Sequence, residues 1–120
     1  MVERLGLAAP CGARKGILMV NEVHVIGRVS GEPRCQELPS GDQVVTWRLV
    51  VPRSTGTGVD TIDCAAWSAS VRRRAERLSD GSQVEINGEL RRRFWRTPTG
   101  AASRYEVEVQ QVRRARSPGP

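Results

Sequence analysis

Residues 81–95 read GSQVEINGELRRRFW, and this stretch decides the fold. Val84, Ile86 and Leu90 recur at even positions, a two-residue period that predicts a long strand with these three side chains turned inward. Gly88 falls in the middle of the strand, where a bend or bulge is expected because glycine offers no side chain to the core. The strand then ends in a run of arginine and aromatic residues.

Four further segments, before and after this strand, show the same alternation. They are residues 20–30, 43–51, 61–67 and 104–112, with a short extended run at 34–38 after a break at Gly31-Glu32-Pro33. The compositions of residues 39–42 and 97–100 are typical of tight turns. Residues 52–60, rich in Ser, Thr and Gly, are expected to form a flexible loop.

One helix is expected between the third and fourth long strands. Val71, Ala75 and Leu78 recur at i, i+4 and i+7, which is typical of one apolar helix face. Ser68 or Ser70 is expected to cap its N-terminus. Three strands, a helix and two strands are the order of a five-stranded Greek-key barrel. The sequence therefore predicts an all-β OB-fold with the helix between strands three and four.

The patterned part of the chain is expected to form one domain at residues 19–113, with one mostly aliphatic core. Residues 1–18 lack a sustained period and are expected to be a loose arm, or to lie upstream of a true start at Met19. Residues 114–120 are expected to form a short disordered tail.

Charge favours a polyanionic partner. The chain has 19 basic and 13 acidic residues, a formal net charge of +6, and Lys15 is its only lysine. The guanidinium group of arginine forms paired hydrogen bonds with phosphate and also stacks on flat rings. Nucleic acid is therefore the leading partner. A generic arginine-rich surface is the alternative that composition leaves open.

Catalysis is the least suitable function for this sequence. Cys11, Cys35 and Cys64 share no C-x-x-C spacing, and His24 is the only histidine. We therefore expect no cofactor, no metal site and no nucleophile–base pair. Residues 1–18 do not resemble a secretory signal, and no apolar segment is long enough to cross a membrane. A cytoplasmic, nucleoid-associated protein without a membrane partner is expected.

The run at residues 91–96, RRRFWR, is the strongest candidate for function. Strand alternation sends Arg91, Arg93 and Trp95 to one face and the other three side chains to the opposite face. An aromatic ring among guanidinium groups suits single-stranded nucleic acid, because the ring stacks on a base while the arginines neutralise phosphates. The alternative is a solvated basic hairpin whose aromatic rings pack on a neighbouring chain.

Two other tryptophans need separate interpretations. Trp67 lies between the third strand and the helix, where the pattern alone fits a core plug and a binding position equally well. Trp47 shares a strand face with Val45 and Leu49, so we expect it in the core.

Further candidates are arginines outside the run. Arg48 is on the face opposite Trp47, and Arg53 is the only basic residue in the flexible loop. The helical run at residues 72–74 is expected to be a solvated face. The complete set of expected binding residues is Trp67, Trp95, Phe94, Arg91, Arg93, Arg48, Arg96, Arg53 and Arg104.

Several of these segments resemble bacterial single-stranded DNA-binding proteins. Residues 20–28, VNEVHVIGR, resemble the opening strand of that family with its N-x-V-x-x-x-G pattern. Residues 81–91 are similar to the family's G-S-x-V-x-I-E-G-x-L-R segment. Glu32-Pro33 and residues 39–41 resemble its D-P and P-x-G elements. The resemblance extends from about residue 20 to residue 112.

The resemblance implies an OB-fold that binds single-stranded DNA without strong sequence preference, in DNA replication, recombination or repair. It implies a homo-oligomer, with a tetramer favoured and a dimer as the alternative. Trp67 and Trp95 fall where the family has stacking aromatic residues, and Arg91 and Arg93 match basic positions. Two further family aromatics have no match, because residues 54–55 and 61 are serine and threonine here.

The C-terminal part departs from the family, which typically carries a long tail with an acidic tip that recruits other proteins. No acidic residue follows Glu108 in this sequence. We therefore expect a short paralogue that lacks the acidic tail and does not recruit proteins through it. A primosome-type OB assembly module and a single-stranded RNA binder remain alternatives.

Overall fold

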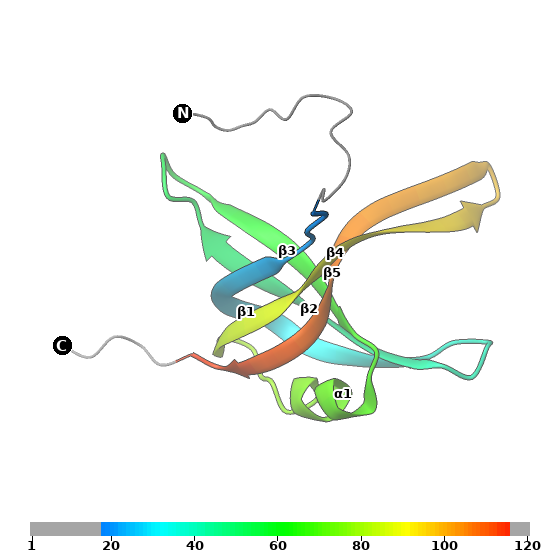
Figure 1. The fold of residues 1–120 in the computed structure, drawn as a ribbon, viewed down its shortest axis with the longest axis horizontal. Coiled ribbons are helices and arrows are strands. Elements are labelled where there is room, and N and C mark those ends of the chain that lie inside the picture. The colour runs from blue at the N-terminus through cyan, green and yellow to red at the C-terminus, as the bar shows by residue number, and fades with distance from the viewer. Residues whose placement is uncertain (1–17, 116–120) are drawn as a thin grey trace.

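Within residues 18–115, five strands and one helix form in the order that the periodicity predicts. They are β1 (Val23–Glu37), β2 (Gln43–Pro52), β3 (Val59–Ala66), α1 (Ala69–Ala75), β4 (Gln83–Thr97) and β5 (Gly100–Arg114). The strands close into a barrel in the order β1-β2-β3-β5-β4 (Figure 1). All neighbouring pairs are antiparallel except β3 and β5, which are parallel. The prediction of an all-β OB-fold with one helix between strands three and four is confirmed.

The computed structural model describes residues 18–115. Residues 1–17 of the expected arm at 1–18 and residues 116–120 of the expected tail at 114–120 lie outside the described residues. Their boundaries therefore stay predictions.

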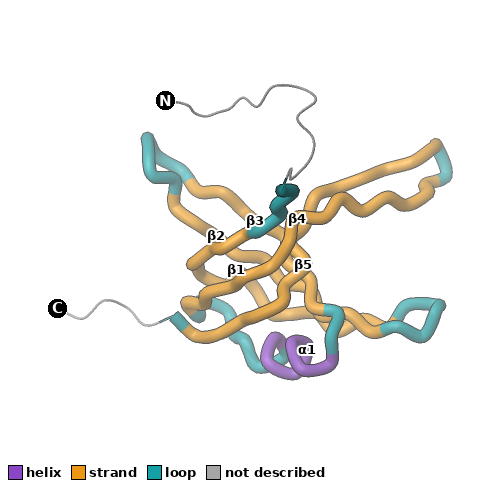
Figure 2. Tube along the Cα trace, in the orientation of Figure 1, coloured by secondary structure: helices purple, strands orange, loops and turns teal. Residues whose placement is uncertain are grey.

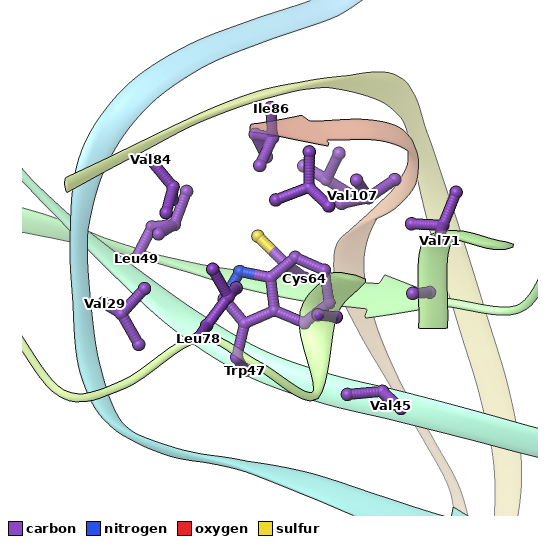
Figure 3. Close-up of a cluster of buried hydrophobic side chains, with 14 residues drawn as sticks. Val29, Val45, Trp47, Leu49, Cys64, Val71, Leu78, Val84, Ile86 and Val107 are labelled. Atoms are coloured by element: carbon purple, nitrogen blue, oxygen red, sulfur yellow. The ribbon is translucent and has the colours of Figure 1, made fainter. Parts of the chain in front are cut away.

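Aliphatic side chains fill the barrel, as the composition predicts. Leu49, Val84 and Ile86 are fully buried, and Trp47 is only 4% exposed (Figure 3). The prediction that Trp47 belongs to the core is confirmed. Its indole Nε1 has no hydrogen-bond partner within the described structure. Burial of the large ring outweighs that unsatisfied donor, since an indole removes a large apolar area from water.

Helix α1 lies against one end of the barrel, at the bottom of Figure 2. Val71 and Ala75 are buried on the predicted apolar face, but the helix ends at Ala75, earlier than the sequence predicts. Leu78 is buried from the turn that follows the helix, where its N–H donates to the Ala75 carbonyl three residues back. The Ser68 side chain accepts a hydrogen bond from the backbone N–H of Val71 at 3.4 Å, so Ser68 is the N-cap. The helix contacts β5, β2 and β3.

Strand β1 does not end at Gly31-Glu32-Pro33 as the sequence suggests. It continues to Glu37, and its pairing with β2 shifts register between Ser30 and Arg34. Gly31 has a φ of +83°, a left-handed conformation that glycine adopts at little cost. The glycine therefore bends the strand without terminating it.

At Gly88 the backbones of β4 and β5 come close together. The register jumps here, from Asn87 opposite Gln111 to Gly88 opposite Val109, so Gln110 is the extra residue of a bulge on β5. The predicted irregularity is confirmed. A Cβ at Gly88 would lie 2.2 Å from the backbone oxygen of Glu108, far inside contact distance. Only glycine permits this approach without a backbone shift.

The prediction that Leu90 points into the core is wrong, because its side chain is 45% exposed. Strand β1 pairs with β4 only as far as Gly88, so β4 has left the barrel by this point. The Asn21 side chain occupies the free edge of β4. It accepts from the Leu90 N–H and donates to the Leu90 carbonyl, both at 2.9 Å. Beyond Leu90, β4 and β5 continue as a projecting two-stranded hairpin (Figure 1).

A small ionic cluster joins three strands near the start of β4, at the end away from the hairpin. Glu85 accepts from Arg113 Nε at 3.0 Å through one oxygen and contacts His24 Nε2 at 2.5 Å through the other. The hydrogen bond with His24, and then that with Arg113, hold the pKa of Glu85 below its ordinary value of 4.5. This carboxylate therefore links β1, β4 and β5.

Replacing Gly88 with alanine should lower the free energy of unfolding by about 1–3 kcal/mol, the usual cost of overpacking a filled site. Chemical denaturation measures this difference. Gly56→Asn is the matched control, because Gly56 has a φ of +73° and open space around it. An equal loss of stability in both variants would contradict the close approach at Gly88.

Candidate nucleic-acid interface

One face of the β4–β5 hairpin carries Trp95. The register places Arg93 opposite Arg104 and Trp95 opposite Ala102. The Arg104 guanidinium carbon lies 5.7 Å from the centroid of the Trp95 ring, within cation–π range. Trp95 is 45% exposed, so part of the ring remains open to a ligand.

The same face continues to Trp67 through Arg93. The guanidinium carbon of Arg93 lies 4.6 Å from the centroid of the Trp67 ring, which is half-buried. Arg93 Nη1 also donates to Glu106 Oε2 at 3.3 Å. We call the set Trp67, Arg93, Trp95, Arg104 and Glu106 the tryptophan face. Two indole rings, each beside a guanidinium group, thus lie on one continuous surface.

Glu106 is the buried acidic member of the tryptophan face, with a relative exposure of 7%. Its carboxylate neutralises Arg93 and fixes the guanidinium over Trp67. A buried carboxylate needs such a partner, because an unpaired charge out of water is costly. Glu106 therefore positions Arg93 and at the same time reduces its attraction for phosphate.

The opposite face of the hairpin carries Phe94. The Arg92 guanidinium carbon lies 5.0 Å from the Phe94 ring centroid and 5.4 Å from that of Tyr105. Arg92 also donates to Ser103 Oγ at 3.0 and 3.2 Å. Phe94 and Tyr105 are 69% and 57% exposed. Arg92 thus lies between two open aromatic rings on what we call the phenylalanine face.

A hollow of about 360 Å³ adjoins the tryptophan face on the barrel surface. Arg104 and Glu106 belong to both. The hollow is lined by Ser30, Glu32, Arg34, Thr46, Trp47, Arg48, Asp63, Cys64, Arg104 and Glu106. Arg48 Nε donates to Asp63 Oδ1 at 3.1 Å inside it. The structure therefore connects the predicted residue Arg48 to the hairpin through a single concave surface.

Several predicted arginines have acidic neighbours that the sequence did not reveal. Arg53 pairs with Asp60 at 3.1 Å, and Arg91 pairs with Glu89 and Glu108 at 3.0 Å each. Such exposed pairs are weak, so a phosphate can replace the carboxylate at small cost. Within residues 18–115, Arg96 and Arg104 have no acidic partner in any ion pair.

The structure does not bring all predicted residues together. Trp67, Arg93, Trp95 and Arg104 share the tryptophan face, and Arg48 reaches it through the hollow. Alternation places Phe94 and Arg96 on the phenylalanine face. Arg91 lies at the base of the hairpin, beside Glu89 and Glu108. Arg53 belongs to the β2–β3 loop, which projects to the upper left in Figure 1 while the hairpin projects to the upper right.

Sequence reasoning missed Arg92, Tyr105 and Arg34. Alternation alone groups Arg92 with Phe94, so the exposed aromatic was a usable signal for that arginine. The exposure of Tyr105 depends on the point where the hairpin leaves the barrel. The position of Arg34 in the hollow depends on the curvature of β1. Neither property is encoded in a local pattern.

The described residues contain no site suited to metal binding or to thiol chemistry. No group of three or more His, Cys, Asp or Glu side chains lies together between residues 18 and 115. Burial raises the pKa of the Cys64 thiol above its ordinary value. The pKa of the Cys35 thiol is also raised, mainly by desolvation and secondly by the neighbouring Glu76 carboxylate. Across the same residues, no helix is long and apolar enough to cross a membrane.

Comparison with known proteins gives concordant matches. The sequence model of the Single-strand binding protein family matches residues 20–115. The chain is 30% identical over 97 residues to single-stranded DNA-binding protein A of Bacillus subtilis, covering 77% of this chain and 56% of the relative. It is 29% identical over 102 residues to the single-stranded DNA-binding protein of Aquifex aeolicus, covering 79% of this chain and 69% of the relative. The chain thus spans little more than half the length of the Bacillus protein.

A solved structure described as the Plasmodium falciparum SSB complex with ssDNA has the same fold. The TM-score is 0.67 at 21% identity, over 82% of this chain and 95% of that chain. The likeness at this identity establishes the fold alone. The family match, in contrast, covers most of the chain and includes both tryptophans of the tryptophan face. The chain belongs to the single-strand binding protein family.

Proposed function

We propose that this chain binds single-stranded DNA without strong sequence preference and has no catalytic activity of its own. The tryptophan face carries the proposal, because it joins two partly open indole rings and two guanidinium groups to a concave surface. Membership of the single-strand binding protein family, and relatives named as single-stranded DNA-binding proteins, support it. The processes served would be DNA replication, recombination or repair.

In this mechanism the bases stack on Trp67 and Trp95 while arginines hold the phosphates. Arg104 lies at both Trp95 and the hollow, so it is placed to meet the backbone between two stacked bases. Arg48 exchanges its Asp63 partner for a phosphate. Each phosphate neutralised on a single strand contributes about −0.7 to the slope of log affinity against log salt. Affinity should therefore fall steeply as salt rises.

Other predicted contacts depend on the path of the strand. Phe94 and Arg96 on the phenylalanine face are reached by a strand that passes around the edge of the hairpin. Arg91 contributes after release from its two carboxylates. Arg53, on the far loop, stays a predicted contact. Stacking and phosphate contacts do not read the 2′-hydroxyl, so competition with matched RNA measures the preference for DNA.

Assembly and location form part of the proposal. A homo-oligomer, with a tetramer favoured over a dimer, follows from the resemblance to the bacterial family. Exposed apolar side chains on the barrel, Ile26 at 52% and Val59 at 48%, suit contacts between copies. We propose a cytoplasmic protein associated with the nucleoid.

Trp95→Ala should weaken binding of an oligothymidylate by about 1–3 kcal/mol, the typical value of one base stack. Fluorescence anisotropy of the labelled oligonucleotide measures the dissociation constant. Phe94→Ala is the matched control, because it removes a more exposed ring from the other hairpin face and should still cost less. Equal losses in the two variants would contradict the assignment of stacking to the tryptophan face.

Trp47→Ala separates stability from binding. This ring is in the core, so its removal should lower the free energy of unfolding by about 3–5 kcal/mol. Thermal melting of the free protein measures this loss, and Trp95→Ala should leave the melting temperature nearly unchanged. A Trp95→Ala variant as unstable as Trp47→Ala would show that Trp95 is a structural residue.

Glu106→Gln should tighten binding of the same oligonucleotide. Glutamine keeps a similar shape and can still accept from Arg93, but it no longer neutralises the guanidinium charge. The salt slope should then steepen by up to about 0.7, the contribution of one phosphate. Glu108→Gln, an exposed partner of Arg91, is the comparison. An unchanged slope in Glu106→Gln would show that Arg93 does not contact phosphate.

A further inference from the structure

A second basic surface lies where α1 meets β5, and the tryptophan face does not include it. Two adjoining hollows of about 290 and 300 Å³ run along this contact and share Arg74, Val112 and Arg113. The first is lined by Ser70, Val71, Arg74, Gln110, Gln111, Val112 and Arg113; the second by Arg74, Arg77, Leu78, Val112, Arg113 and Arg114. We call the four arginines Arg74, Arg77, Arg113 and Arg114 the α1–β5 seam.

The charge balance of the α1–β5 seam differs from that of the other hollows. No acidic residue lines either seam hollow within the described chain. The hollow beside the tryptophan face instead combines three arginines with three carboxylates, and another beside Arg72 contains Glu37 and Glu76. The seam therefore gathers four arginines, of which only Arg113 has a carboxylate partner among residues 18–115, Glu85 outside the two hollows.

The individual arginines of the seam are available to a ligand. Arg74, Arg77 and Arg114 have no acidic partner in any ion pair within residues 18–115. Arg113 uses its Nε for Glu85, which also contacts His24. Arg72, the neighbour of the seam on α1, donates instead to the backbone carbonyls of Gln43 and Trp67. In the arginine run of the helix, Arg72 is thus a structural residue and Arg74 belongs to the seam, while Arg73 is exposed outside both hollows.

The chemistry of the seam favours a phosphate backbone over a protein. Arginine, serine and glutamine side chains are common phosphate ligands in nucleic-acid complexes. No aromatic residue lines either hollow, so bases have no ring to stack on. An acidic protein segment would need an apolar pocket for an anchor residue to bind tightly. The apolar residues that line the hollows, Val71, Leu78 and Val112, are already buried in the core and offer little such surface.

We propose that the α1–β5 seam is a second nucleic-acid site, which binds the phosphodiester backbone by charge alone. The proposal goes beyond the stacking function assigned to the tryptophan face. Figure 2 shows α1 at the bottom of the barrel and the β4–β5 hairpin projecting at the upper right, so the two surfaces are separate. The backbone is supplied by a duplex, or by a single strand that continues past the hairpin.

The test uses the full chain and two double variants. Arg74→Glu with Arg77→Glu reverses charge in the seam, while Arg28→Glu with Arg73→Glu lowers the net charge by the same amount at exposed positions outside both hollows. Anisotropy at several salt concentrations measures binding to a blunt duplex, a short oligothymidylate, a long oligothymidylate and polyglutamate. Thermal melting verifies that both variants fold.

The seam variant should weaken binding of the duplex, the long oligothymidylate or both, more than the control variant does. For the duplex, its salt slope should become shallower by about 1.8, the contribution of two phosphates. Loss on the duplex identifies a duplex as the source of the backbone, and loss on the long strand alone identifies a continuing strand. Binding of the short oligothymidylate should change equally in both variants.

Equal losses in the two double variants would overturn the proposal, because net charge alone would then explain binding. The absence of any loss on both the duplex and the long oligothymidylate would also overturn it. Polyglutamate binding that depends on Arg74 and Arg77 while neither nucleic acid does so would overturn it in favour of an acidic protein partner. Failure of the short oligothymidylate to bind the unaltered chain would contradict the stacking function instead, and the duplex result would still decide the seam.

Discussion

The close approach of β4 and β5 at Gly88 is the constraint on which the rest of the structure depends. It brings the backbone oxygen of Glu108 to a position that any side chain at Gly88 would occupy. The bulge at this point sets the register of the whole hairpin beyond it. That register puts Arg93 opposite Arg104 and so creates the tryptophan face. A backbone contact in the core thus determines which side chains meet at the proposed DNA surface.

The arginines of this protein differ in how many carboxylate partners they have from one surface to another. Near the tryptophan face most arginines have carboxylate partners, which hold the guanidinium groups in place and moderate their attraction for phosphate. In the α1–β5 seam only Arg113 has such a partner, Glu85, among the described residues. The same net charge of +6 therefore yields two kinds of surface. One combines oriented guanidinium groups with aromatic rings, and the other presents mostly uncompensated charge without rings.

Local patterns were sufficient for the order of strands and helix along the chain, the N-cap of the helix, the burial of Trp47 and the irregularity at Gly88, because each rests on nearest neighbours in sequence. They placed Leu78 on the helix, although the helix ends at Ala75. They failed for Leu90, since alternation does not reveal where a strand leaves the barrel. They also missed the pairing of Arg93 with buried Glu106, which depends on cross-strand register. Trp67 illustrates the limit: its pattern left core and surface equally open, and only the position of Arg93 relates it to Trp95.

The central claim, that bases stack on Trp67 and Trp95, is tested most directly by tryptophan fluorescence during titration with poly(dT) at low and high salt. Stacking should quench the two accessible indoles and leave the emission of buried Trp47, and the quenching should require more poly(dT) at high salt. Absence of quenching at low salt, under conditions where anisotropy shows the nucleic acid bound, would contradict the account.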